Sequence, residues 1–135
     1  MRALVDTSAL IALSRRRDQY HARAVDIAER HLVAGGQFVG TTLILGELHS
    51  HLLYLRGAEE ARATVLNLLD DPIHEWVEVA ADLTRDSVLR WLNRFPDQRF
   101  SIIDAVSFEV MRRERLTSAF AFDRHFEVAG FELLA

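Results

Sequence analysis

Four acidic residues occupy positions at which a parallel α/β sheet could bring their side chains together. Asp6 and Asp123 each follow a short apolar run that predicts a strand, and Asp104 lies in the first turn of a predicted helix. Glu47 lies on another predicted helix, beside an apolar stripe. Because ligand sites in open α/β sheets lie just outside the carboxyl ends of the strands, we expect these acids to converge.

Converging carboxylates have a chemical consequence. Two unit charges about 4 Å apart repel each other by about 4 kcal/mol at an effective dielectric constant near 20. Four clustered carboxylates therefore require either protonation or a bound cation. Oxygen ligands suit hard ions such as Mg²⁺ or Mn²⁺, so the pattern points to a divalent metal site.

Each acid taken alone also has a structural explanation. Asp6 could cap a helix that begins at the next residue, and Asp104 could complement a helix dipole. Glu47 could be a surface residue, and Asp123 an ordinary turn residue. The prediction of a site depends on all four acids arriving at one edge of the sheet.

Other residue types narrow the chemistry. All 16 residues in the Lys+Arg count are arginines, which excludes P-loops, Schiff-base enzymes and the lysine-dependent phosphatase or receiver-like domains that place an aspartate after the first strand. Glu47 and His51 are spaced i, i+4 on one predicted helix, next to His49. Zinc could bind such a set, but the sequence offers no convincing third ligand.

The composition is that of an ordinary globular protein. The chain has 135 residues, of which 50% are hydrophobic and 27% charged, so we expect one domain over residues 1–135. No apolar stretch approaches the roughly 20 residues needed to cross a bilayer, and the start of the chain does not resemble a signal peptide. There is no cysteine, which excludes disulfides and thiolate sites. We expect a cytoplasmic protein.

Short strands alternating with helices must position the acids. We predict strands at 2–5, 38–40, 74–79, 119–122 and 131–134, and helices at 7–14, 18–34, 58–69, 82–95 and 102–115. A further helix, capped by Thr42 and closed by Gly57, would carry Glu47. Such alternation indicates an α/β fold with a parallel sheet covered on both faces.

Four segments resemble the successive motifs of PIN-domain ribonucleases: "LVDTSALIAL", "TTLILGELHSHLL", "RFSIIDAVSFEVMRRERL" and "AFAFDRHFEVAGFELL". The resemblance covers essentially the whole chain and is greatest to the VapC-type toxins of bacterial and archaeal toxin–antitoxin pairs. It implies a PIN-like three-layer α/β/α domain with a short-stranded, mostly parallel central sheet. The chain departs from the pattern at His125, where many relatives carry another acid.

The resemblance also implies a function. The activity would be hydrolysis of RNA phosphodiester bonds with Mg²⁺ or Mn²⁺ as cofactor. The catalytic and metal-binding acids would be Asp6, Glu47, Asp104 and Asp123, supported by a hydroxyl of Thr7 or Ser8. His125 is a further supporting candidate, although it departs from the family pattern. Arginines would hold the phosphates, and the run Arg15, Arg16 and Arg17 is an RNA-binding candidate, although a solvated charge run explains it as well.

The implied partners are an RNA substrate, a cognate antitoxin protein and a second copy of the chain in a homodimer. No membrane partner is expected. Leu53 and Tyr54, on the helix that carries Glu47, could serve either protein interface. Two alternatives stay open. One is a metal-independent ribonuclease that uses paired histidines, and the other is a catalytically silent module that binds RNA or protein.

Overall fold

The computed structural model describes residues 1–135, and its centre is a sheet of five strands. The strands are β1 (Arg2–Val5), β2 (Gln37–Thr41), β3 (His74–Val77), β4 (Ser118–Phe120) and β5 (Glu132–Leu133). They lie in the order β3-β2-β1-β4-β5, and every neighbouring pair is parallel. The carboxyl ends of β1 and β4 therefore lie side by side, which is the arrangement that the acids require.

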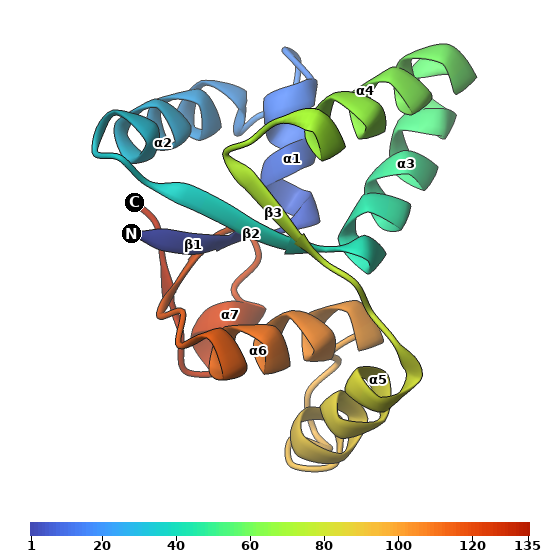
Figure 1. Ribbon diagram of the computed structural model, residues 1–135, viewed down its shortest axis with the longest axis vertical. Helices are drawn as coiled ribbons and strands as arrows, with labels where there is room; N and C mark the ends of the chain where they lie inside the picture. The colour runs from blue at the N-terminus through green and yellow to red at the C-terminus, as the bar shows by residue number, and fades with distance from the viewer.

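Helices cover both faces of the sheet, giving three layers (Figure 1). One layer contains α1 (Thr7–Ser14), α2 (His21–Val33), α3 (Thr42–Arg56) and α4 (Ala58–Asp70). The other contains α5 (Ala81–Ser87), the π-helical turn η1 (Val88–Leu92), α6 (Ile102–Glu114) and α7 (His125–Val128). None of these helices has both the length and the apolar character needed to span a bilayer.

The two faces of the sheet bury separate hydrophobic cores. Side chains alternate along β1, so Ala3 and Val5 belong to the core under α1–α4, whereas Leu4 belongs to the core under α6. The same alternation places Phe38 of β2 in the first core and Val39 in the second. All five side chains are buried, and this double burial fixes the register that brings the strand ends together.

The structure confirms the α/β fold and corrects several element boundaries. The helix predicted at 18–34 begins only at His21, because the Asp18 carboxylate accepts a hydrogen bond from the Tyr20 N–H at 2.8 Å and holds a turn. The cap of α3 is Thr41 and not Thr42: the Thr41 hydroxyl accepts from the Ile44 N–H at 3.3 Å. The Thr42 hydroxyl accepts instead from the Val79 N–H at 3.2 Å, beyond the end of β3.

Two further corrections concern the second half of the chain. The helix predicted at 82–95 is α5 followed by η1, and it ends at Leu92. The strand predicted at 119–122 ends at Phe120, since the Phe122 N–H donates to the hydroxyl of Ser8 and not to a neighbouring strand. Helix α7 was not predicted, because four residues are too short to show a helical period.

Candidate active site

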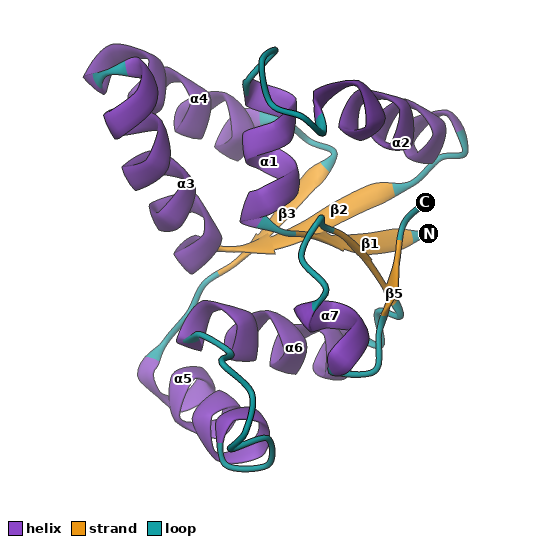
Figure 2. Cartoon of the chain, turned by 180° about the vertical axis from the view of Figure 1, so that it is seen from behind, coloured by secondary structure: helices purple, strands orange, loops and turns teal.

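Three aspartates come together at the carboxyl edge of the sheet, where the chain leaves the strands for α1 and α7 (Figure 2). Asp6 directly follows β1, Asp123 lies in the loop between β4 and α7, and Asp104 lies in the first turn of α6. Atoms of Asp104, Asp123 and His125 that could bind a metal ion all lie within 4.8 Å of one another. Asp6 is near enough to Asp104 and Glu47 for their charges to act on its ionisation.

Asp6 is the N-cap of α1 and is also the most buried of the four acids, with an exposed fraction of 7%. Its Oδ2 accepts hydrogen bonds from the Ser8 N–H at 3.2 Å and from the Ser8 hydroxyl at 2.7 Å. Burial raises the pKa of Asp6 to about 6; the bonds from Ser8 oppose the rise, and the charges of Asp104 and Glu47 add to it. The folded protein therefore keeps an acid at this edge whose ionised form is unfavourable.

Asp104 forms a capping box with Ser101 at the start of α6. The Asp104 N–H donates to the Ser101 hydroxyl at 3.0 Å, and Asp104 Oδ2 accepts from the Ser101 N–H at 3.0 Å. The same Oδ2 lies 3.0 Å from His125 Nδ1. These capping bonds hold the Asp104 carboxylate at the N-terminus of α6, where the side chain is 13% exposed.

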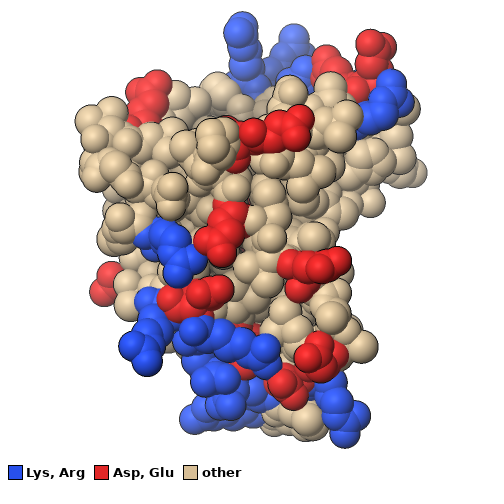
Figure 3. Space-filling model, viewed as in Figure 1, with Lys and Arg blue, Asp and Glu red and all other residues tan.

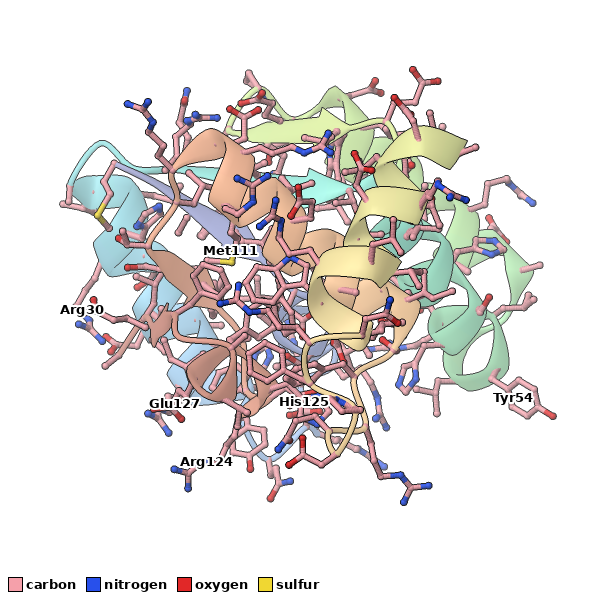
Figure 4. All side chains as sticks on the ribbon, turned by 90° about the horizontal axis from the view of Figure 1, so that it is seen from below. Arg30, Tyr54, Met111, Arg124, His125 and Glu127 are labelled. Atoms are coloured by element: carbon pink, nitrogen blue, oxygen red, sulfur yellow. The ribbon has the colours of Figure 1, made fainter.

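Asp123 and His125 form a tight turn that faces Asp104. Asp123 Oδ1 accepts from the His125 N–H at 2.9 Å and lies 3.4 Å from His125 Nδ1. The imidazole packs edge-on against Phe100, with ring centroids 5.4 Å apart. His125 thus turns toward the aspartates, with its side chain 35% exposed, and Figure 4 labels it in the same part of the molecule as Arg124 and Glu127.

The three aspartates share one pattern of hydrogen bonds. In Asp6 and Asp104, every hydrogen bond from the protein goes to Oδ2, and in Asp123 every one goes to Oδ1. The second oxygen of each carboxylate has no hydrogen-bond partner in the protein. Each side chain is therefore oriented through one oxygen while the other stays available to a ligand, which is the donor set that suits a hard divalent ion.

Glu47 and the two hydroxyls contribute differently. Glu47 is exposed and forms no hydrogen bond, so its link to the site is its charge acting on Asp6. The Ser8 hydroxyl donates to Asp6 and accepts from the Phe122 N–H at 3.0 Å, which ties the loop after β4 to α1. The Thr7 hydroxyl is buried with no hydrogen-bond partner, an orphaned polar group beside the acids.

An aromatic pair that the sequence did not single out supports this loop. Tyr20 stacks on Phe122, with ring centroids 4.7 Å apart and planes 4° from parallel. Beside the aspartates lies a hollow of about 580 Å³. Its lining includes Ser8, Ile11, Asp18, Gln19, Tyr20, Phe122, Asp123, Arg124 and His125. The residues around Tyr20 are separated by about 100 positions from Asp123, so no local pattern predicts their contact.

The structure does not support zinc binding by the histidines of α3. His49 and His51 belong to no group of histidine and acidic residues close enough to hold a metal. The predicted patch of Arg15, Arg16 and Arg17 follows the far end of α1, about 12 Å along that eight-residue helix from Asp6. These arginines line a hollow of about 550 Å³ together with Arg56, whose guanidinium donates to the Ser14 carbonyl at 3.0 Å.

Known proteins share this architecture. The PIN-domain family model matches residues 3–132 of the chain. The chain is 33% identical over 129 residues to the 23S rRNA-specific endonuclease VapC20 of Mycobacterium tuberculosis, covering 94% of this chain and 93% of that protein. The crystal structure of that toxin, described as cleaving the Sarcin-Ricin loop, superposes with a TM-score of 0.81 at 31% identity, covering 96% and 95% of the two chains.

More distant solved structures share the fold. VapBC2 from Rickettsia felis, bound to a DNA fragment from its promoter, has a TM-score of 0.71 at 10% identity, covering 98% of this chain and 97% of that chain. FitAcB from Neisseria gonorrhoeae has a TM-score of 0.68 at 13% identity, covering 100% and 97%. The chain therefore belongs to the PIN-domain family, and within that family to the VapC-type proteins.

Proposed function

We propose that the protein is a divalent-metal-dependent endoribonuclease and the toxin of a type II toxin–antitoxin pair. The observation that carries this proposal is the set of three aspartates, each oriented through one oxygen with the other left without a protein partner, beside the charge of Glu47. The 33% identity to a 23S rRNA-specific endonuclease supports RNA, and folded ribosomal RNA in particular, as the substrate class.

The acids Asp6, Glu47, Asp104 and Asp123 would hold Mg²⁺ or Mn²⁺. When bound, such an ion acidifies a water molecule and stabilises the charge that develops on the phosphate oxygens. The chain's own residues supply the geometry. Ser8 fixes Asp6 and the loop of Asp123, while the Ser101 cap fixes Asp104.

His125 would act within the metal site and not as a general base. Its Nδ1 lies within hydrogen-bonding distance of Asp104, and the cluster that could bind a metal contains no second histidine. A paired-histidine ribonuclease needs two imidazoles at the scissile phosphate, so this arrangement favours the metal-dependent reaction. A silent module would also lack a reason to bury an acid whose pKa is raised to about 6.

An antitoxin protein and a second copy of the chain are the proposed protein partners. The end of α3 supports this part of the proposal, because apolar side chains there are exposed. Tyr54 is 95% exposed, and Figure 4 shows it pointing away from the body of the molecule. Leu53 and Leu55, on either side, are each 45% exposed.

The test is cleavage of a ribosomal RNA fragment by the purified protein with Mn²⁺, with Mg²⁺ and with excess EDTA. We expect Asp104→Asn to abolish cleavage, because it removes a ligand charge while the amide oxygen can still accept from the Ser101 N–H. Asp26→Asn is the matched control: Asp26 is exposed on α2 and pairs only with Arg30. Circular dichroism verifies folding of both variants.

The chemical groups at the ends of the RNA products distinguish the metal-dependent reaction from that of a histidine ribonuclease. Metal-dependent hydrolysis should leave 5′-phosphate and 3′-hydroxyl ends, as the family resemblance implies, whereas a histidine ribonuclease leaves a cyclic phosphate. Full cleavage in EDTA, or an Asp104→Asn variant as active as the control, would contradict the proposed function.

A further inference from the structure

A second polar hollow lies outside the acidic site, and its lining contains none of the four acids Asp6, Glu47, Asp104 and Asp123. It encloses about 590 Å³ between α5, η1 and α6, and only one of its eight lining residues is hydrophobic. Four arginines line it: Arg90, Arg94, Arg112 and Arg113. Figure 3 shows arginines gathered over this lower part of the molecule, where Figure 1 shows α5 and α6.

A buried glutamate holds three of these arginines in place. The side chain of Glu109 is 1% exposed, and its Oε2 lies 2.8 Å from Arg112 Nη2 and 2.9 Å from Arg113 Nε. Its Oε1 lies 3.2 Å from Arg90 Nε and accepts from the Trp91 indole N–H at 3.1 Å. Burial would raise the pKa of Glu109, but the bonds from Arg112, Arg113 and Trp91 outweigh it and lower the pKa to about 2.

The cluster keeps a positive excess and free donors. Four arginines face two acids, Glu109 and Asp86, so the net charge of the hollow is +2. Each guanidinium carries five N–H groups, of which Arg112 and Arg113 use only those directed at the acids. Arg94 forms neither a hydrogen bond nor an ion pair. Preorganised guanidinium groups of this kind match the oxygens of a phosphate.

The acids at the other site make such a surface necessary for a polyanionic substrate. They repel phosphates until a cation is bound, and the whole chain has a net charge of −4. The segment 93–101 connects the two sites: it begins with Asn93 and Arg94 in the hollow and ends at Ser101, which caps α6 beside Asp104. Within this segment, Phe100 contacts His125.

We propose that the arginine hollow between α5, η1 and α6 binds backbone phosphates of the RNA substrate, at a distance from the phosphate that is cut. This inference rests on the proposed ribonuclease function. Helix α6 sets the spacing, since Arg112 lies eight residues from Asp104, about 12 Å along the helix axis. A folded RNA contacts both places, whereas a very short oligonucleotide reaches only the acids.

The test measures binding of a ribosomal RNA hairpin of roughly 30 nucleotides by fluorescence anisotropy in EDTA, where no cleavage occurs. The variant is Arg90→Gln/Arg94→Gln, which leaves Arg112 and Arg113 on Glu109 and so protects the fold. We expect its affinity to fall about 10-fold near 0.15 M salt. The slope of log affinity against log salt should become less negative by about 1.4 if the two lost phosphate contacts are in the loop and by about 1.8 if they are in the paired stem.

The matched control is Arg30→Gln/Arg62→Gln, which removes the same charge from exposed positions on α2 and α4, in the opposite layer. Its affinity should change less than twofold. Arg90→Lys/Arg94→Lys should restore most of the salt slope, because it restores the charge. Equal RNA affinity and salt slope in the Gln variant and the wild type would overturn the inference.

Two more outcomes separate this inference from its alternatives. If the Gln variant loses binding to polyglutamate but keeps its RNA affinity, the hollow serves an acidic protein segment, and the inference fails. A wild type that binds the hairpin through these arginines but cuts no RNA with any metal would refute the nuclease function alone. A wild type that cuts RNA while the Gln variant binds as tightly would refute the RNA-binding hollow alone.

Discussion

The charge of Asp6 should destabilise the metal-free protein, and Asp6→Asn should relieve that cost. The substitution keeps the N-cap of α1, because asparagine caps helices about as well as aspartate and its amide oxygen can accept from the Ser8 N–H and hydroxyl. It removes only the ionisation. The variant therefore isolates the free energy of holding a carboxylate at this buried position beside Asp104 and Glu47.

The expected size follows from the pKa of Asp6, which is raised from 3.8 to about 6. A difference of about 2 units at about 1.4 kcal/mol each gives about 3 kcal/mol. Between these two values the folded protein holds a proton that the unfolded chain has released, so wild-type stability falls as the pH rises through this interval. The cost is complete above about pH 6 and absent below about pH 4.

The assay is urea unfolding of both proteins in EDTA from pH 4 to pH 7.5. We expect equal free energies of unfolding at pH 4 and a variant more stable by about 3 kcal/mol at pH 7.5, or roughly 10 °C in melting temperature. Added Mn²⁺ should raise the melting temperature of the wild type more than that of the variant, by ligand linkage. A difference that does not change with pH would refute the reasoning, because a strained charge must titrate.

Two further substitutions test the remaining charges. His125→Asp brings a third carboxylate to Asp104 and Asp123. In a thermal shift assay, Mg²⁺ should therefore raise the melting temperature of this variant more than that of the wild type. An equal rise would place His125 outside the metal site. Glu109→Gln should lower the free energy of unfolding by about 2 kcal/mol at pH 7 in urea titrations, less than for a fully buried pair because its arginines are 41% to 46% exposed. Because the pKa of Glu109 is lowered from 4.5 to about 2, this stabilisation is present above pH 4.5 and disappears as the pH falls toward 2. A stability difference between variant and wild type that stays constant over that range would contradict this prediction.

Local patterns in the sequence predicted much of the fold, because they reflect local physics. The strand Arg2–Val5 and the helix Thr7–Ser14 have the predicted bounds, and α6 begins at Ile102 as predicted. The errors arise where a residue far away in the sequence determines where an element ends. The alternating run at 119–122 predicts four strand residues, but the Phe122 N–H bonds to Ser8, 114 positions away, and the strand ends early.

The arginine hollow leaves only a local signal in the sequence. Arg112 and Arg113 stand three and four residues after Glu109, a spacing that predicts ion pairs on one helix face. At the level of sequence, these arginines also suit the carboxyl end of a helix, where they complement its dipole. What the sequence lacks is the packing of η1 against α6, which brings Arg90 onto the same carboxylate and turns a helix pair into a cluster.

At this site one aspartate can have a structural role and a functional role at the same time. A capping carboxylate needs one oxygen for the helix, and in both Asp6 and Asp104 the capping bonds fall on Oδ2 alone. Those bonds hold the side chain in one rotamer, so the free oxygen keeps a fixed direction without further contacts. Capping thus contributes the positioning that a metal ligand requires, and a buried acid with a raised pKa is the residue that gains most when a cation arrives.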